Sequence, residues 1–333
     1  MARSVRFSAA IDTNHREATM RDNTPRHHSD TIRQAAYSEN TRIAYEKGWR
    51  CFATYCDGRG LCPYEAESED IVEFFATLAG QSSDPPRRGM SLGTLRLYRS
   101  ALNRRYAERG KMSPAAATVV GDALRGLARL KDHVPRRVKA LRDYHIVAML
   151  DECGDTRFGC RDAAMLALGF AAALRRSELC GLKVADIDFI ERDRMTVTIR
   201  RSKTDQRGEG QSVAVPNGKA IRPISRLQEW LQTAGITEGY IFQTFRRGGK
   251  PSGRSLSHSE VPRVIKRYAA KIGLDPRSYS GHSLRAGVVT SAAAHHARLD
   301  KIMEVTRHRN PTTELKYIRE ATVFVDHAGA GFL

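Results

Sequence analysis

Apolar residues recur at helical spacing through the first part of the chain, from about residue 37 to residue 130. Such spacing gives a helix one apolar face toward a core and one polar face toward solvent. We expect helices over 41–55, over 71–78 after Ser68 and Asp70, over 92–110, and a single helix over 114–130. The pattern therefore predicts an all-helical domain at 37–130, preceded by a polar, Arg-rich flexible tail at 1–36.

The second part of the chain, from residue 140 to residue 333, has a different pattern. Residues 163–174 are apolar on nearly every side, which predicts a buried helix. Segments 187–190, 195–199 and 213–215 are rich in β-branched residues and are separated by a turn and a polar loop, which predicts a small antiparallel sheet. The basic, Pro-containing stretch 131–139 is the expected linker. The expected fold is mainly α, with an N-terminal helical bundle and a mostly α C-terminal domain that contains the sheet.

Candidate chemistry is concentrated near the end of the second part. His282 and Arg285 are three residues apart, so they share one face of a helix. The preceding Ser-Gly pair would begin that helix and leave free backbone N–H groups for an anion. His308 follows in a polar loop, and Tyr317 lies on a short helix with Asn310 as its N-cap. Taken singly, each would suit a solvated face or a packing role. The ordered set indicates a phosphate site.

Upstream residues complete this set. Arg175 ends the buried helix beside Ser177, the expected N-cap of the next helix, and Glu178 follows. Lys203 lies in the loop between the last two expected strands. An arginine at a helix end and a lysine in a loop are common features. Arg175 and Lys203 are therefore candidate site residues only because the other polar residues of the set are also present.

The residues Arg175, Lys203, His282, Arg285, His308 and Tyr317, in this order and spacing, resemble the active site of the tyrosine recombinase (phage integrase) family. The segments SENTRIAYEKGW and GTLRLYRSALNRRY are similar to the N-terminal domain of its Cre-type members, to which the pattern is closest. Cre-type members carry tryptophan where this chain has His308, whereas most of the family has histidine. The resemblance covers roughly 38–320 and implies a two-domain clamp on DNA.

The resemblance implies a site-specific DNA recombinase that cuts and rejoins strands by transesterification through a 3′-phosphotyrosine. Two arginines, Arg175 and Arg285, would bind the nonbridging oxygens of the phosphate. His282 and His308 would add hydrogen bonds, and one of them would move a proton. Tyr317 would be the nucleophile and Lys203 the acid that protonates the leaving oxygen. Glu178 would orient a catalytic partner, as the acidic residue of this motif does in the family.

A net charge of +18 fits a polyanionic partner. We expect double-stranded DNA with inverted half-sites, bound by a homotetramer on two duplexes. A basic protein at a membrane surface is the competing class, but the sequence has no apolar run near the ~18 residues of a spanning helix. Candidate DNA contacts in the first domain are polar or basic residues of two expected helices: Thr41, Arg42, Lys47, Arg96, Arg99 and Asn103.

No cofactor is expected. The six cysteines form no C-x-x-C pair, so the sequence suggests neither a zinc site nor a disulfide framework. The sequence also lacks a phosphate-binding G-x-x-x-x-G-K-[ST] loop. A cytoplasmic, nucleoid-associated protein of bacterial, phage or plasmid origin is expected.

Two alternatives remain open. A type IB topoisomerase shares the chemistry, but those enzymes place the tyrosine in S-K-x-x-x-Y, and this chain has Thr312-Thr313 at the Ser-Lys positions. A non-catalytic DNA-binding protein on the same scaffold is the other alternative, and the six intact site residues argue against it.

Overall fold

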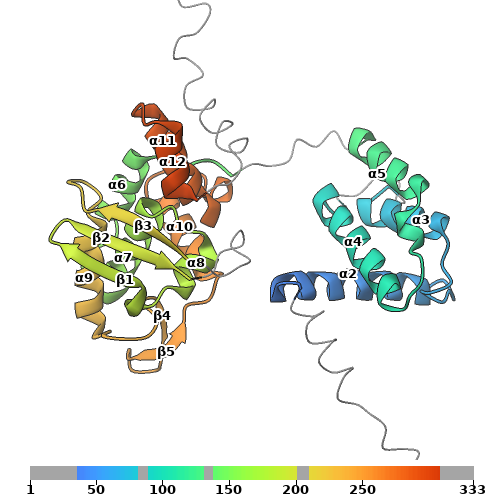
Figure 1. The fold of residues 1–333 in the computed structure, drawn as a ribbon, viewed down its shortest axis with the longest axis horizontal. Helices are drawn as coiled ribbons and strands as arrows, with labels where there is room; N and C mark the ends of the chain where they lie inside the picture. Colours follow the sequence, from blue (N-terminus) through green and yellow to red (C-terminus); the bar gives the residue numbers. More distant parts are fainter. Residues whose placement is uncertain (1–35, 82–88, 131–137, 201–209, 308–333) are drawn as a thin grey trace, which may run out of the picture. The chain divides into compact units, whose positions relative to one another are not determined.

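The computed structural model describes residues 36–81, 89–130, 138–200 and 210–307. The chain divides into two compact units, Met1–Val134 and Pro135–Leu333. Helices dominate each unit, and the strands form two small antiparallel sheets in the second (Figure 1). The expected mainly α fold is therefore confirmed.

The first unit is helical throughout its described part. Serine side chains cap two of its helices, because Ser38 accepts a hydrogen bond from the N–H of Thr41 and Ser91 accepts one from the N–H of Thr94. Gly48 lets two helices approach closely, since a Cβ there would lie 2.9 Å from the Tyr98 ring. The helices are α2 (Glu39–Asp57), α3 (Ser68–Ala79), α4 (Leu92–Glu108) and α5 (Thr118–Leu130).

The single helix expected over 114–130 is wrong. A 3₁₀ turn spans Pro114–Ala116, Ala117 leaves the helical region, and α5 begins only at Thr118. The guanidinium of Arg99 provides the physical reason. It donates to the carbonyls of Ala115 at 2.7 Å and Ala116 at 3.2 Å, which a continuous helix would have used internally.

The second unit packs its helices around one buried core. The strand order β1-β2-β3 is antiparallel throughout, as expected, and Met195, Val197 and Ile199 of the middle strand point into the core. The strands of this sheet are β1 (Ile187–Glu191), β2 (Arg194–Ile199) and β3 (Gln211–Pro216). The helices are α6 (Asp143–Asp151), α7 (Arg157–Ala171), α8 (Arg176–Gly181), α9 (Pro223–Ala234), α10 (Glu260–Lys271), α11 (Gly281–Ala294) and α12 (Leu299–Thr306).

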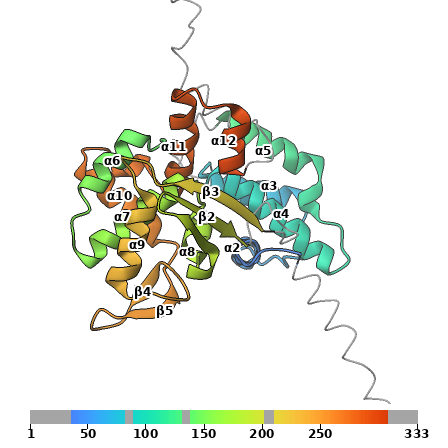
Figure 2. The same ribbon diagram turned by 60° about the vertical axis from the view of Figure 1, so that its left-hand side comes forward.

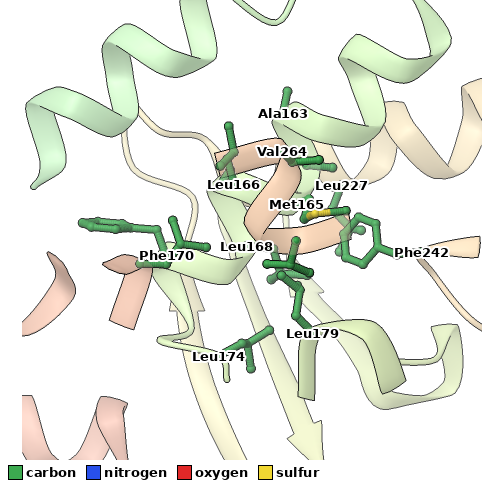
Figure 3. Packing of buried hydrophobic residues seen from close by; sticks show 14 of the residues in the cluster. Ala163, Met165, Leu166, Leu168, Phe170, Leu174, Leu179, Leu227, Phe242 and Val264 are labelled. Carbon is green, nitrogen blue, oxygen red and sulfur yellow. The ribbon is translucent and has the colours of Figure 1, made fainter. Parts of the chain in front are cut away.

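Helix α7 is the centre of this core. It is buried from Gly159 to Phe170. A buried helix was expected over 163–174, but α7 begins at Arg157 and ends at Ala171, so Arg175 does not end it. Figure 3 shows side chains of α7 packed among Leu227 of α9, Val264 of α10, and Phe242, which directly precedes residue 243. Because α7 is held on all sides, the residues at its C-terminal end have a fixed position.

Some elements of the second unit were not expected from the sequence. A second, two-stranded sheet joins β4 (Gln243–Phe245) and β5 (Pro251–Ser255). These strands are short, and β5 contains proline and glycine, so the pattern carried no strand signal. Helix α12 packs beside α11, as both views show (Figure 2).

Helix α11 is fixed by a close backbone approach. The N–H of Leu141 donates to the carbonyl of Ser283 at 3.0 Å. A Cβ at Gly287 would overlap the Leu141 carbonyl, so glycine is required for this contact. The segment before α6 therefore positions the helix that carries His282 and Arg285.

Candidate active site

The C-terminal end of α7 turns sharply and delivers Arg175 to the site. The N–H of Ala173 donates to the carbonyl of Phe170 at 2.9 Å, and the N–H of Leu174 donates to that of Gly169 at 3.0 Å. This is the Schellman pattern that ends many helices. Ala173 takes the left-handed conformation that the motif needs, with φ of 47°. The turn leaves the carbonyls of Ala172 and Ala173 facing the site.

Glu178 is the acceptor around which this turn is organised. Its side chain is 2% exposed and accepts from the N–H of Arg175 at 2.8 Å and from Arg175 Nη1 at 2.6 Å. Burial alone would raise the pKa of Glu178, but the Arg175 N–H and the charges of Arg307 and Arg175 outweigh it and lower the pKa below 4.5. Glu178 is thus ionised at neutral pH and orients Arg175.

These contacts correct one expectation. Ser177 is not the N-cap of α8, because Arg175 takes that position. The side chain of Glu178, three residues later, bonds back to the N–H of Arg175 in the manner of a capping box. The Glu178 carboxylate therefore accepts the hydrogen bond of the Arg175 backbone N–H, which fixes the position of Arg175. Ser177 lies exposed within the first turn of α8.

Arg285 reaches the same place from α11. Its residue is 5% exposed, its Nη1 donates to the Ala173 carbonyl at 2.8 Å, and its Nη2 donates to the Thr306 carbonyl. Burial, and next the positive charges of Arg175 and Arg307, lower the pKa of Arg285 to about 9. A negatively charged ligand beside Arg285 would counteract this lowering by favouring the charged guanidinium.

His282 lies one turn before Arg285, at the start of α11. The helix begins after Ser280, whose hydroxyl accepts from the N–H of His282 at 3.4 Å, so the helix start expected at the Ser-Gly pair is confirmed. His282 is exposed, whereas Arg285 is buried. The helix therefore offers an accessible imidazole beside the positive end of its dipole.

Arg307 is a site residue that the sequence did not reveal. Its guanidinium donates to Glu178 Oε2 at 2.9 Å and to the carbonyls of Ala172 and Ala173 at 2.9 and 3.1 Å. In the sequence it is one of several charges around His308, and nothing distinguishes it from a solvated arginine. Its partners are 129 to 135 residues away, so only the fold brings them together.

The structure brings Arg175, Glu178 and Arg285 together, with His282 on the helix that carries Arg285. Lys203, His308 and Tyr317, and the helix expected after Asn310, lie outside the described residues. Arg200, which precedes the loop of Lys203, pairs with buried Asp186.

The candidate DNA contacts of the first unit differ in what their side chains do. Arg42, Lys47 and Arg96 are exposed, although Arg42 pairs with Glu39. Arg99 is held by the carbonyls of the 3₁₀ turn. Thr41 and Asn103 are half-buried, and the hydroxyl of Thr41 lies 2.9 Å from that of Ser38.

Within the described ranges, no group of three or more His, Cys, Asp and Glu side chains is arranged to hold a metal ion. The helices of the same ranges include none that is long and apolar enough to cross a membrane. The described part of the site is thus a cluster of arginines around one carboxylate, which is chemistry suited to an anionic ligand.

Comparison with known proteins gives relatives along most of the chain. The integrase/recombinase XerD homolog of Selenomonas ruminantium is 30% identical over 87% of this chain and 84% of its own length. The recombinase Cre of Escherichia phage P1 is 25% identical over 85% of each chain. The chain was expected to resemble Cre-type members most, but its identity to Cre is lower than its identity to this XerD homolog.

Solved structures share the fold. The Tn1549 transposon integrase in complex with transposon right end DNA covers 87% of this chain and 92% of its own, with a TM-score of 0.58 and 18% identity. A lambda integrase dimer bound to a COC′ core site covers 88% and 93%, with a TM-score of 0.55 and 17% identity. The phage integrase family matches residues 139–322, which include every candidate catalytic residue. The chain therefore belongs to the phage integrase family of tyrosine recombinases.

Proposed function

We propose that this protein is a site-specific DNA recombinase that cuts and rejoins DNA by transesterification through a 3′-phosphotyrosine. The observation that carries the proposal is the convergence of Arg175 and Arg285 on the C-terminal turn of α7. Each guanidinium is fixed by a buried acceptor, Glu178 for Arg175 and the Ala173 carbonyl for Arg285. Family membership and relatives named as recombinases support the same reaction.

The arginine pair supplies the electrostatic part of the reaction. Attack on a phosphodiester builds negative charge on its nonbridging oxygens, and preorganised donors stabilise that charge most in a site that excludes water. Arg175 has a side chain that is 15% exposed, so it can reach a ligand while Glu178 holds it. Arg285 is more deeply buried and carries a pKa of about 9, so a phosphate restores the charge balance around it.

The remaining roles rest on the family pattern. Tyr317 attacks the phosphorus, forms the 3′-phosphotyrosine and releases a 5′-hydroxyl strand. Lys203 protonates the leaving 5′-oxygen, and His282 and His308 donate hydrogen bonds to the phosphate. The phosphotyrosine conserves the bond energy, so a 5′-hydroxyl from another strand can reverse the step without ATP.

Two duplexes with inverted half-sites are the proposed substrate, bound by four copies of the chain. Arg42, Lys47 and Arg96 are exposed cations in the first unit, and they would contact the duplex there. Solved structures of the same fold support a DNA partner, because the Tn1549 integrase is in complex with transposon right end DNA and the lambda integrase dimer is bound to a COC′ core site. The two units would close on the duplex as a clamp.

Strand exchange between two labelled duplexes tests this function against its alternatives. The duplexes carry a site selected from a genomic DNA pool for binding by the protein. A recombinase yields joined products that contain both labels. A topoisomerase-like enzyme relaxes supercoiled DNA without exchange, and a non-catalytic protein only shifts the duplex in a gel. Either of the last two results would overturn the proposal.

A further inference from the structure

Arg307 is a buried charge that the proposed reaction does not use. It is 7% exposed and follows directly after α12. Its side chain is 3% exposed, so it does not reach a bound DNA strand. A buried guanidinium needs partners, and Arg307 has four of them within hydrogen-bond distance.

These four contacts tie three segments together. Two of them go to the carbonyls of Ala172 and Ala173, at the negative end of the α7 dipole. One goes to the Val305 carbonyl at 3.1 Å, within the helix that Arg307 ends. The fourth goes to Glu178 Oε2 at 2.9 Å. Only a planar fork with several N–H donors can make such a set, and a lysine ammonium cannot.

Arg307 shares acceptors with both proposed phosphate-binding arginines. Glu178 accepts from Arg175 and from Arg307. The Ala173 carbonyl accepts from Arg285 at 2.8 Å and from Arg307 at 3.1 Å. Removing Arg307 therefore removes one hydrogen bond from Glu178 and one from the Ala173 carbonyl. Both acceptors then hold Arg175 and Arg285 less firmly.

The backbone at Arg307 would suit glycine better. Its φ is 57°, in the left-handed region, where a Cβ is unfavourable and where glycine commonly ends helices. The chain nevertheless has an arginine here, and the side chain makes all the contacts described above. This combination indicates that the guanidinium serves a purpose beyond ending α12.

We propose that Arg307 is a positioning residue, which locks Glu178 and the α7 turn and so holds Arg175 and Arg285 in their phosphate-binding geometry. It also fixes the point from which the chain continues to His308 and Tyr317. The inference rests on the proposed function. The lowered pKa of Arg285, caused by burial and then by Arg175 and Arg307, agrees with a third cation close to the pair.

The test uses the full-length chain and a nicked duplex that traps the covalent adduct. Arg307→Gly should bind a half-site within about twofold of wild type, because Arg307 does not touch DNA. Its rate of adduct formation should fall by about 10²-fold, the usual effect of misplacing catalytic groups by about 1 Å. Adding guanidinium ions at a concentration that does not unfold the protein should restore part of this rate, because the ion can occupy the vacated position.

Arg222 offers a matched control. It is an exposed arginine with a φ of 51°, and no hydrogen bond of its side chain is found among the described residues. Arg222→Gly should leave both binding and adduct formation unchanged, and guanidinium ions should not affect its rate. The double variant of Arg307→Gly with Glu178→Gln should form the adduct at the rate of whichever single variant is slower. The reason is that each change alone already releases Arg175.

Several results would overturn the inference. One is a wild-type rate of adduct formation for Arg307→Gly, and another is a slow rate that guanidinium ions do not change. A third is a double variant whose rate falls by the product of the two single reductions. If Arg307→Gly does not fold, Arg307→Lys replaces it, because lysine keeps the charge without the fork, and a wild-type rate in that folded variant overturns the inference. If wild-type protein itself forms no adduct, the proposed function fails, whatever Arg307 does.

Discussion

The substitution Glu178→Gln tests the carboxylate on which the arginine cluster depends. Among the described residues, Glu178 Oε2 accepts from Arg175 N–H and from Arg307, whereas Oε1 accepts from Arg175 Nη1 alone. A glutamine side chain keeps most of these bonds if its NH₂ group takes the place of Oε1. Even so, the charge-assisted bond from Arg175 Nη1 is lost, which costs about 1.5–3 kcal/mol. The arginines also lose their buried counter-charge, and breaking a buried pair in this way costs about 3–5 kcal/mol. We therefore expect the free energy of unfolding to fall by about 3–5 kcal/mol.

Tryptophan fluorescence during urea unfolding can report on the second unit alone. The chain has two tryptophans, and Trp49 lies in the first unit. A Trp49→Phe background leaves Trp230, which is fully buried in the second unit and donates to the Ile241 carbonyl at 2.9 Å. Glu152→Gln is the control, because Glu152 forms a half-exposed pair with Lys271 and should cost at most about 1 kcal/mol.

The pH dependence gives a second test of the same carboxylate. The pKa of Glu178 is lowered in the folded protein, so its contribution is fully present above its ordinary value of 4.5 and is lost as the pH falls through the folded pKa. The stability difference between wild type and Glu178→Gln should thus stay constant from about pH 8 to pH 5 and narrow below 4.5. A loss no larger than that of Glu152→Gln at neutral pH would refute the reasoning.

Four further predictions concern other parts of the chain. Gly287→Ala should destabilise the second unit by about 1–3 kcal/mol through overlap with the Leu141 carbonyl. Gly126→Ala, where a Cβ meets nothing within 4 Å, should stabilise α5 by up to about 1 kcal/mol, and urea unfolding checks both. Lys203→Ala should cleave ordinary DNA about 10²–10⁴-fold more slowly, yet approach wild type on a 5′-phosphorothiolate substrate, whose sulfur leaves without an acid. A defect of full size on the sulfur substrate would show that another residue is the acid. Deleting the chain from Ala321 onward should spare half-site binding but weaken cooperative filling of a full site in a gel-shift titration, and unchanged cooperativity would exclude docking of this tail on a neighbouring subunit.

Much of the fold follows from local pattern. The apolar run over 163–174 predicts a buried helix, which α7 provides although it ends three residues earlier. The alternation of Met195, Val197 and Ile199 predicts a strand, which forms where expected. The serine cap before His282 likewise depends on neighbours in sequence. Such features can be read from a chain because the interactions that cause them are short in range.

The errors have long-range or side-chain causes. The helix over 114–130 is broken by Arg99, a residue of another helix that takes up its carbonyls. Ser177 was expected to cap α8 from its residue type, but Glu178 bonds back to Arg175 instead. Arg307 was missed because the partners that bring it to the site, on α7 and α8, lie more than 100 residues away.

The measurement that tests the central claim most directly is mapping of the covalent bond between protein and DNA. Wild-type protein is mixed with a nicked duplex that traps cleavage, and the adduct is digested and sequenced by mass spectrometry. The account predicts a nucleotide linked through its 3′-phosphate to Tyr317, a free 5′-hydroxyl on the released strand, and no adduct with Tyr317→Phe, which should still bind the half-site. An adduct on any other residue, or one formed by Tyr317→Phe, would contradict it.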